Sequence, residues 1–164
     1  MNHQLIIKNI ARGSYSPIYF LHGQEPYYID LIEKFATSQI IGEEAKDFDQ
    51  TIVYGKDTDL QTIINSAKRF PMMGSHQVVS VREAQNFKKF DELIQYAKNP
   101  QNQTVLIFSF KGKKLDARTQ KKLNKNVEFF ESKKLYDNQV PGWIINQVEA
   151  LQLKISEKSS VILS

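Results

Sequence analysis

The amino-acid sequence predicts an α/β fold in which a parallel sheet is flanked by helices. One observation is the continuous apolar run at residues 18–21, which is typical of a strand buried on both faces. A second is that similar short, β-branched runs alternate along the chain with segments whose apolar residues recur at helical spacing. Strands that alternate with helices indicate a parallel, helix-covered sheet.

Glycine and proline residues mark the ends of the first elements. A short helix is expected over residues 4–11, with Leu5, Ile6, Ile7 and Ile10 facing inward and Gly13 ending it. The strand at 18–21 leads through Gly23 to a helix that begins at Pro26, because the fixed φ of proline suits a first helical position.

A capping box at residues 58–61, with Thr58 as the cap, opens the next helix. The apolar residues of that helix fall on one face, at Leu60, Ile63, Ile64 and Ala67. Other strands are expected at 51–54, 78–81, 104–110 and 127–130, and other helices over 87–97 and 115–123. The strand at 104–110 is the most apolar and is expected at the centre of the sheet.

The pattern changes towards the end of the chain. Residues 1–138 are expected to form the α/β domain, and residues 139–164 the beginning of a small, helical, lid-like second domain. Pro141 opens a helix there, with Ile144, Val148 and Leu151 expected inward. Ser156 has the form of a helix cap, and the apolar stripe that follows is expected to continue beyond the last residue.

The turn at Gly23 has the frame of a phosphate-binding loop but not its chemistry. Such a loop needs further glycines, a Lys for the phosphates and a Ser or Thr for magnesium. The residues that follow Gly23 are Gln, Glu, Pro, Tyr, Tyr and Ile. Glu25 would repel a phosphate, and Pro26 lacks an amide donor. The sequence therefore predicts a nucleotide-binding type of domain that binds no nucleotide and needs no cofactor.

A second would-be nucleotide element is also altered. In phosphate-loop ATPases the third strand ends in acidic residues that hold magnesium, whereas here it ends in Arg82 and Glu83. Arg82 is either a mark of lost ATP use or an ordinary surface residue at the end of a strand.

No catalytic or metal-binding residues are predicted. The chain has no Cys, and its three His are scattered, without metal-ligand spacing. His22 stands at a strand end, where catalytic residues often lie, but a satisfied structural histidine explains it more simply. The carboxylates from Glu43 to Asp49 are better explained by a solvated loop than by an acid–base pair.

Three large apolar residues, Phe70, Met72 and Met73, follow the capped helix around Pro71 and before Gly74. Methionine is adaptable and favoured at binding surfaces, and proline reduces the entropy that ordering costs. One interpretation is an anchor for a partner's pocket. The other is that these side chains pack under the loop against the sheet.

The charge of the chain is unevenly distributed. The segment from Lys111 to Lys134 holds nine of the 22 Lys and Arg residues and three of the 18 acids, so its charge is +6, and the other residues sum to −2. A basic segment after a central strand suits phosphate contacts, although a solvated face is also expected to be Lys-rich. The candidate DNA contacts are Lys111, Lys113, Lys114, Arg118, Lys121 and Lys122.

Taken together, these residues resemble the N-terminal part of the delta subunit of bacterial DNA polymerase III, the clamp-loader wrench. The likeness rests on residues 19–25, on residues 69–74 leading into 78–84, and on Trp143 and Ile144. The resemblance implies a phosphate-loop NTPase or AAA+-like fold that is inactive as an ATPase. It also implies that Phe70, Met72 and Met73 bind the sliding clamp and open it. The family often has an aliphatic residue and then Phe where this chain has two Met residues.

The resemblance implies a non-catalytic subunit of a nucleotidyltransferase complex that acts in DNA replication. Its implied partners are the sliding clamp (beta), the gamma/tau and delta prime subunits, and DNA. The family's third, collar domain is not in this sequence, so the fragment is not expected to assemble a clamp loader alone. With no Cys and no long apolar run, the chain suits the cytoplasm and no membrane partner is expected. Two alternatives remain: a nucleic-acid-binding domain that uses Lys111 to Lys134, and an atypical nucleotide-dependent enzyme.

Overall fold

The computed structural model describes residues 3–123 and 126–164 of the chain. It comprises two compact units, a larger α/β unit, Met1–Ser132, and a smaller helical unit, Lys133–Ser164. Among the described helices, none has the length and hydropathy that a membrane span requires.

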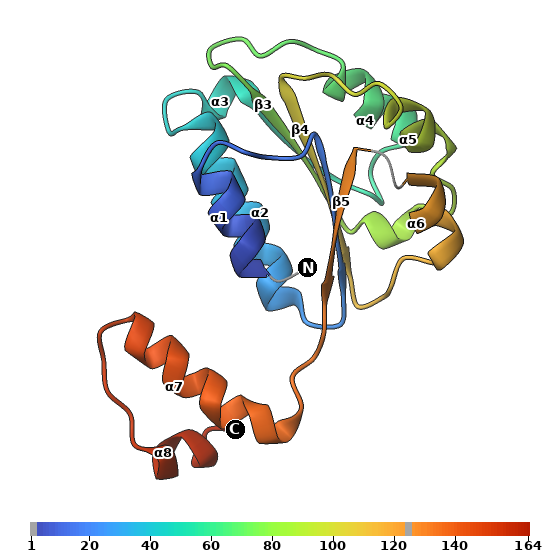
Figure 1. Ribbon diagram of the computed structural model, residues 1–164. Helices are drawn as coiled ribbons and strands as arrows, with labels where there is room; N and C mark the ends of the chain where they lie inside the picture. The colour runs from blue at the N-terminus through green and yellow to red at the C-terminus, as the bar shows by residue number, and fades with distance from the viewer. Residues whose placement is uncertain (1–2, 124–125) are drawn as a thin grey trace. The chain divides into compact units, whose positions relative to one another are not determined.

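The α/β unit is built on a five-stranded sheet in which every strand pairs in parallel with its neighbours (Figure 1). The strands are β1 (Ile18–Gly23), β2 (Gln50–Tyr54), β3 (Gln77–Arg82), β4 (Thr104–Lys111) and β5 (Val127–Ser132). Their order is β2-β3-β4-β1-β5, so β4 lies at the centre, as the sequence predicts. All residues of β4 are buried except the last, because helices cover both faces of the sheet.

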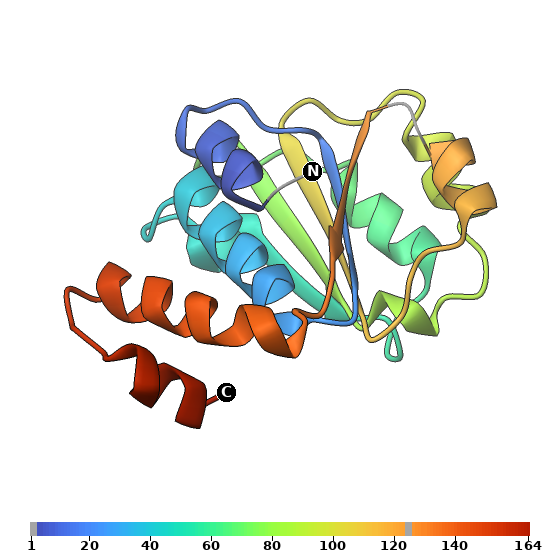
Figure 2. The ribbon, with the colours of Figure 1, turned by 60° about the horizontal axis from the view of Figure 1, so that its bottom comes forward.

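The helices form a layer on each face of the sheet (Figures 1 and 2). On one face α1 (His3–Ala11) and α2 (Pro26–Ile41) bury a cluster that includes Ile6, Ile29 and Tyr19. On the other, α4 (Leu60–Ala67), α5 (Asp91–Tyr96) and α6 (Ala117–Leu123) lie over a cluster around Phe20 and Phe108. The expected fold class, a parallel sheet flanked by helices, is therefore confirmed.

Several details differ from the sequence-based expectation. Leu5, expected inward, is exposed, and the buried residues of α1 are Ile6 and Ile10. The cap of α4 is Asp59 rather than Thr58: the Asp59 carboxylate accepts a hydrogen bond from the Thr62 amide over 2.7 Å. The predicted face of α4 is confirmed, since Leu60, Ile63, Ile64 and Ala67 are all buried.

Two further segments differ in extent. Residues 87–97 are only partly helical, because a 3₁₀ turn, η1 (Ala84–Asn86), precedes the helix and α5 begins at Asp91. Between α2 and β2 lies a single helical turn, α3 (Lys46–Asp49), where only a loop was expected.

The smaller unit consists of η2 (Asp137–Gln139), α7 (Val140–Ala150) and α8 (Glu157–Ile162). Ser156 caps α8 as predicted, accepting a hydrogen bond from the Ser159 amide over 3.1 Å. No residue of α7 is fully buried, and Leu151, expected inward, is 70% exposed.

Candidate functional site

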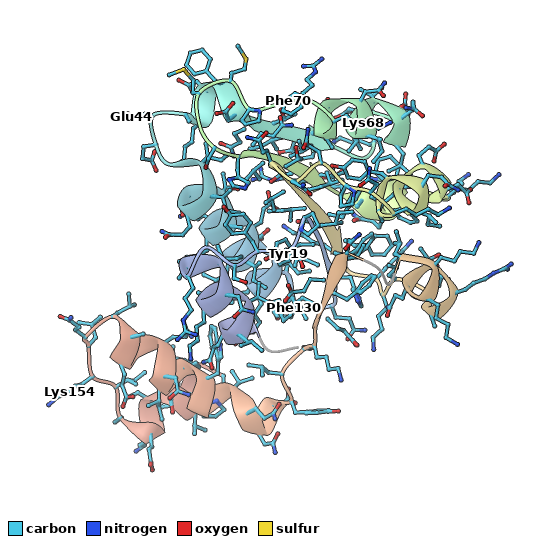
Figure 3. All side chains as sticks on the ribbon, turned by 45° about the horizontal axis from the view of Figure 1, so that its top comes forward. Tyr19, Glu44, Lys68, Phe70, Phe130 and Lys154 are labelled. Carbon is cyan, nitrogen blue, oxygen red and sulfur yellow. The ribbon has the colours of Figure 1, made fainter. Side chains whose placement is uncertain are left out.

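The apolar loop, residues 70–73, connects the end of α4 to the start of β3. It therefore lies at the edge of the sheet where the parallel strands begin. Figure 1 shows the start of β3 and α3 at the opposite end of the sheet from the β1–α2 turn, and Figure 3 places Phe70 at the rim of the unit, away from Tyr19 and Phe130 in the core.

The large side chains of the apolar loop face solvent. Phe70, Met72 and Met73 are 69%, 76% and 64% exposed. The interpretation that they pack under the loop against the sheet is therefore wrong for the free chain. Three adjacent, largely exposed apolar side chains form the kind of patch that marks a contact with another protein.

The backbone of this loop is held by Asp49, the last residue of α3. Its Oδ1 accepts a hydrogen bond from the amide of Met72 over 2.5 Å. Its Oδ2 accepts from the amides of Met73 and Gly74, over 3.0 and 2.6 Å. Asp49 is only 2% exposed, so the expectation of a solvated carboxylate is wrong for this residue. It is buried because three donors replace its water.

The ionisation of Asp49 follows from the same contacts. Burial acts to raise the pKa of its carboxyl group, but the hydrogen bonds from the amides of Met72, Gly74 and Met73 outweigh burial and hold the pKa below its ordinary 3.8. Asp49 is therefore an anion at neutral pH, which strengthens each of the three bonds.

The base of the loop is fixed by a second buried side chain. The amide nitrogen of Gln77 donates to the carbonyl of Arg69 over 2.6 Å and to the hydroxyl of Thr104 over 2.8 Å. The Gln103 side chain donates to the Ser75 carbonyl over 3.2 Å. Both ends of the loop are thus tied to the sheet, while its apolar side chains stay exposed.

At the other edge of the sheet, the amides of the β1–α2 turn from Gly23 to Glu25 are bonded to carbonyls of the protein. The amide of Gly23 donates to the Lys113 carbonyl over 3.1 Å, and those of Gln24 and Glu25 donate to the Ser132 carbonyl over 3.0 and 3.4 Å. Pro26 has no amide proton. The amide of Tyr27 is capped by the Glu25 carboxylate over 3.0 Å, so a side chain of the protein takes the place of an anion at the start of α2.

Gly23 is required here for close packing rather than for phosphate binding. Its φ is +133°, and a Cβ at this position would lie 2.1 Å from the carbonyl oxygen of Ser132. The glycine of the turn thus lets the end of β5 approach the end of β1.

The end of β3 carries an ion pair in place of a magnesium ligand. Arg82 donates from Nε to Oε1 of Glu33 over 2.8 Å, and the Ser109 hydroxyl donates to Oε2 of Glu33 over 2.8 Å. Arg82 is therefore not an ordinary surface residue, since it neutralises a carboxylate buried on α2.

An open hollow of about 680 Å³ adjoins this ion pair. Its charged lining residues are balanced, with four acids and four bases: Asp30, Glu33, Glu43 and Glu83, and Lys34, Lys46, Arg82 and Lys111. Without an excess of cations, the hollow offers no electrostatic preference for a polyphosphate.

His22 is buried at the end of β1, but it is not a fully satisfied histidine. Its Nδ1 has no hydrogen-bond partner among the described residues. Burial lowers its pKa from the ordinary 6.5, while Glu131 acts to raise it and Lys114 to lower it. The described residues contain no cluster of side chains that could hold a metal ion.

The predicted basic residues divide into two groups. Lys111 pairs with Asp30 over 2.5 Å and Lys114 with Glu131 over 2.5 Å, so two of the three lysines around the end of β4 have an acidic partner within the protein. Lys113 and three residues of α6, Arg118, Lys121 and Lys122, are exposed. Lys125, in the same basic segment, lies outside the described residues.

The sequence identified the apolar loop but missed the residues that hold it. Asp49 lies 23 to 25 residues before its partners, and a carboxylate after Gly42 looks like any loop acid. The proximity of a carboxylate at the start of β2 to the loop before β3 follows only from the parallel pairing of these two strands.

Comparison with known proteins identifies what the chain resembles. A family model described as DNA polymerase III, delta subunit, matches residues 19–134. The DNA polymerase III subunit delta of Bacillus subtilis is 25% identical over 165 residues, which cover 93% of this chain and 48% of that protein. The chain thus spans about half the length of the curated relative it matches.

Two solved structures share the fold. The DNA clamp loader delta protein of Bacillus subtilis matches 99% of this chain and 51% of its own, with a TM-score of 0.80 and 23% identity. A DNA polymerase III gamma subunit-related protein of Thermotoga maritima matches 99% of this chain and 58% of its own, with a TM-score of 0.57 and 10% identity. These matches confirm the expected fold, a parallel sheet flanked by helices.

Proposed function

Because the chain belongs to the DNA polymerase III delta-subunit family, whose place is in the clamp loader of DNA replication, we propose that it binds and opens the sliding clamp. The contact is made by Phe70, Met72 and Met73. The chain hydrolyses no ATP of its own, and its role in the holoenzyme is mechanical rather than catalytic.

The observation that carries this proposal is the exposure of three apolar side chains on a backbone that is held in place. Burying a side chain of this size in a pocket contributes about 1.5–3 kcal/mol. Three such side chains can therefore anchor an interface, and the held backbone reduces the ordering entropy that binding costs.

The absence of ATP use is supported by the β1–α2 turn. Its amides are bonded to carbonyls of the protein, and Glu25 caps α2. A nucleotide would have to displace these bonds and overcome the repulsion of Glu25. We propose in turn that ATP is handled by other subunits, gamma/tau, and that delta prime completes the assembly.

The test is the double substitution Met72→Asp plus Met73→Asp, measured by calorimetry against the cognate sliding clamp. Two carboxylates in a desolvated pocket cost several kcal/mol, so binding should be lost. A matched control is Leu151→Asp plus Leu153→Asp, since these leucines are also 70% and 61% exposed. Equal clamp affinity for the Met variant and the wild type would refute the proposal.

A calorimetric titration with ATP and magnesium distinguishes the proposed clamp-binding role from the alternative of an atypical nucleotide-dependent enzyme. The proposal expects no heat of binding. Magnesium-dependent heat would favour an atypical nucleotide-dependent enzyme instead.

A contact with DNA is a second proposed function, supported by the exposed cations at Lys113, Arg118, Lys121 and Lys122. Charges at the end of a parallel sheet and along a short helix suit the positioning of a phosphate backbone. On this proposal the clamp contact and the DNA contact use opposite edges of the sheet.

A further inference from the structure

We propose that Asp49 is the positioning residue of the clamp interface: its carboxylate holds the backbone of the apolar loop so that Phe70, Met72 and Met73 are presented together. This inference rests on the proposed function. It adds a residue that lies outside the loop, on the turn of helix that leads into β2.

The geometry supports positioning rather than general packing. Three successive amides, those of Met72, Met73 and Gly74, converge on the two oxygens of one buried carboxylate. The bonds run from the residue that directly precedes β2 to the loop before β3, so they fix the loop to a second segment of the chain as well as to its own strand. A loop bonded only through its ends would keep conformational freedom in the free protein. It would lose that freedom on binding, and this entropy cost weakens affinity.

The chemical identity of the residue points the same way. An ionised carboxylate only accepts hydrogen bonds, which suits a site where three donors meet. An asparagine would keep one oxygen but would turn its own NH₂ group towards at least one of the amides. A residue that served only to fill the space beneath the loop would be expected to be apolar.

Gly74 fits the same arrangement. A Cβ at this position would lie 3.3 Å from Oδ2 of Asp49 and 3.8 Å from Cβ of Ala45, which is tighter than a comfortable contact with the carboxylate. The absence of a side chain at residue 74 therefore lets the loop close onto Asp49.

The experiment compares Asp49→Ala, Asp49→Asn and Asp49→Glu with the wild type in two measurements. The first is hydrogen exchange at the amides of residues 72–74 in the free protein. The second is affinity for the cognate clamp. Asp47→Asn is the matched control, because Asp47 is on the same helical turn but is exposed.

We expect Asp49→Ala to speed exchange at the three amides and to weaken clamp binding about tenfold or more, which corresponds to the ordering of a few residues. Asp49→Asn should fall between Ala and the wild type. Asp49→Glu should recover part of the loss, since its carboxylate can still accept from the loop. Asp47→Asn should leave both measurements unchanged.

The amide spectrum of the sheet shows whether each variant is folded. If Asp49→Ala does not fold, Asp49→Asn and Asp49→Glu still carry the comparison. Clamp affinity that is equal in the wild type and in all folded Asp49 variants would overturn this inference and leave the proposed function intact. A wild-type chain that does not bind the clamp would overturn both.

Discussion

The guanidinium of Arg82 lies 2.8 Å from the carboxylate of Glu33, whose side chain is only 5% exposed, while that of Arg82 is 40% exposed. The pair joins the end of β3 to α2, which covers the sheet. It occupies the edge of the sheet where a phosphate-loop ATPase would hold magnesium. This edge of the sheet is therefore occupied by a structural ion pair between β3 and α2.

Arg82→Ala should destabilise the α/β unit by about 2 kcal/mol, because it leaves a buried carboxylate with only the Ser109 hydroxyl as a partner. The measurement is the free energy of unfolding in urea. Arg82→Ala plus Glu33→Gln should restore part of the loss, since no buried charge then lacks its cation. A double variant no more stable than Arg82→Ala would contradict this account.

Gly23→Ala should destabilise the chain by more than about 3 kcal/mol or prevent folding, because its Cβ would overlap the Ser132 carbonyl. The matched control is Gly112→Ala. Gly112 also has a positive φ, +76°, but its Cβ would meet nothing within 4 Å, so only backbone strain of about 1–2 kcal/mol is expected. Thermal unfolding of the two variants makes the comparison, and equal effects would exclude the packing explanation.

The stability of the wild type should fall as the pH drops below the ordinary histidine pKa of 6.5, because burial lowers the pKa of His22 in the folded state. The unfolded chain then binds a proton that the folded chain does not. The contribution of His22 to the free energy of unfolding is complete above pH 6.5. It is lost as the pH falls towards the pKa of His22 in the folded state, at no more than about 1.4 kcal/mol per pH unit.

His22→Gln should remove this part of the pH dependence, measured as the difference between urea unfolding curves of the two proteins from pH 7 to pH 5. His3, whose pKa is also lowered by burial, remains in both proteins and cancels in the difference. Parallel pH profiles would show that His22 does not titrate in this range.

Lys121→Glu plus Lys122→Glu should weaken DNA binding and reduce the slope of log affinity against log salt by about two, one for each lost phosphate contact. Lys88→Glu plus Lys89→Glu is a matched control, because these adjacent lysines are exposed in the same unit. Fluorescence anisotropy at several salt concentrations gives the slopes. The same decrease in both variants would indicate general charge repulsion rather than a contact surface.

The sequence predicted those features that depend on neighbouring residues. The face of α4 was predicted from the spacing of Leu60, Ile63 and Ile64, and the central place of β4 from its unbroken apolar run. The prediction that Thr58 caps α4 was wrong, since Asp59 is the cap. Both residue types can cap a helix, and only the backbone geometry decides between them.

The contacts that shape the candidate site join residues far apart in the chain. Asp49 was interpreted as a solvated acid and Arg82 as a possible surface residue, because neither has its partner within a few positions. For the apolar loop, the residues were predicted from the sequence, but their exposure was not. Whether Met72 faces water or the core depends on how the backbone leaves α4, and that path is set by Gln77 and Asp49.

The bonding of the β1–α2 turn bears on any attempt to engineer a nucleotide site there. Placing glycine, lysine and threonine at the positions of a phosphate loop would supply the side chains but not free amides. The backbone would still donate to Ser132 and Lys113, and Gly23 would still pack against the end of β5. A nucleotide site at this turn would therefore require the end of β5 to move away from β1, and substitutions in the turn alone would not be enough.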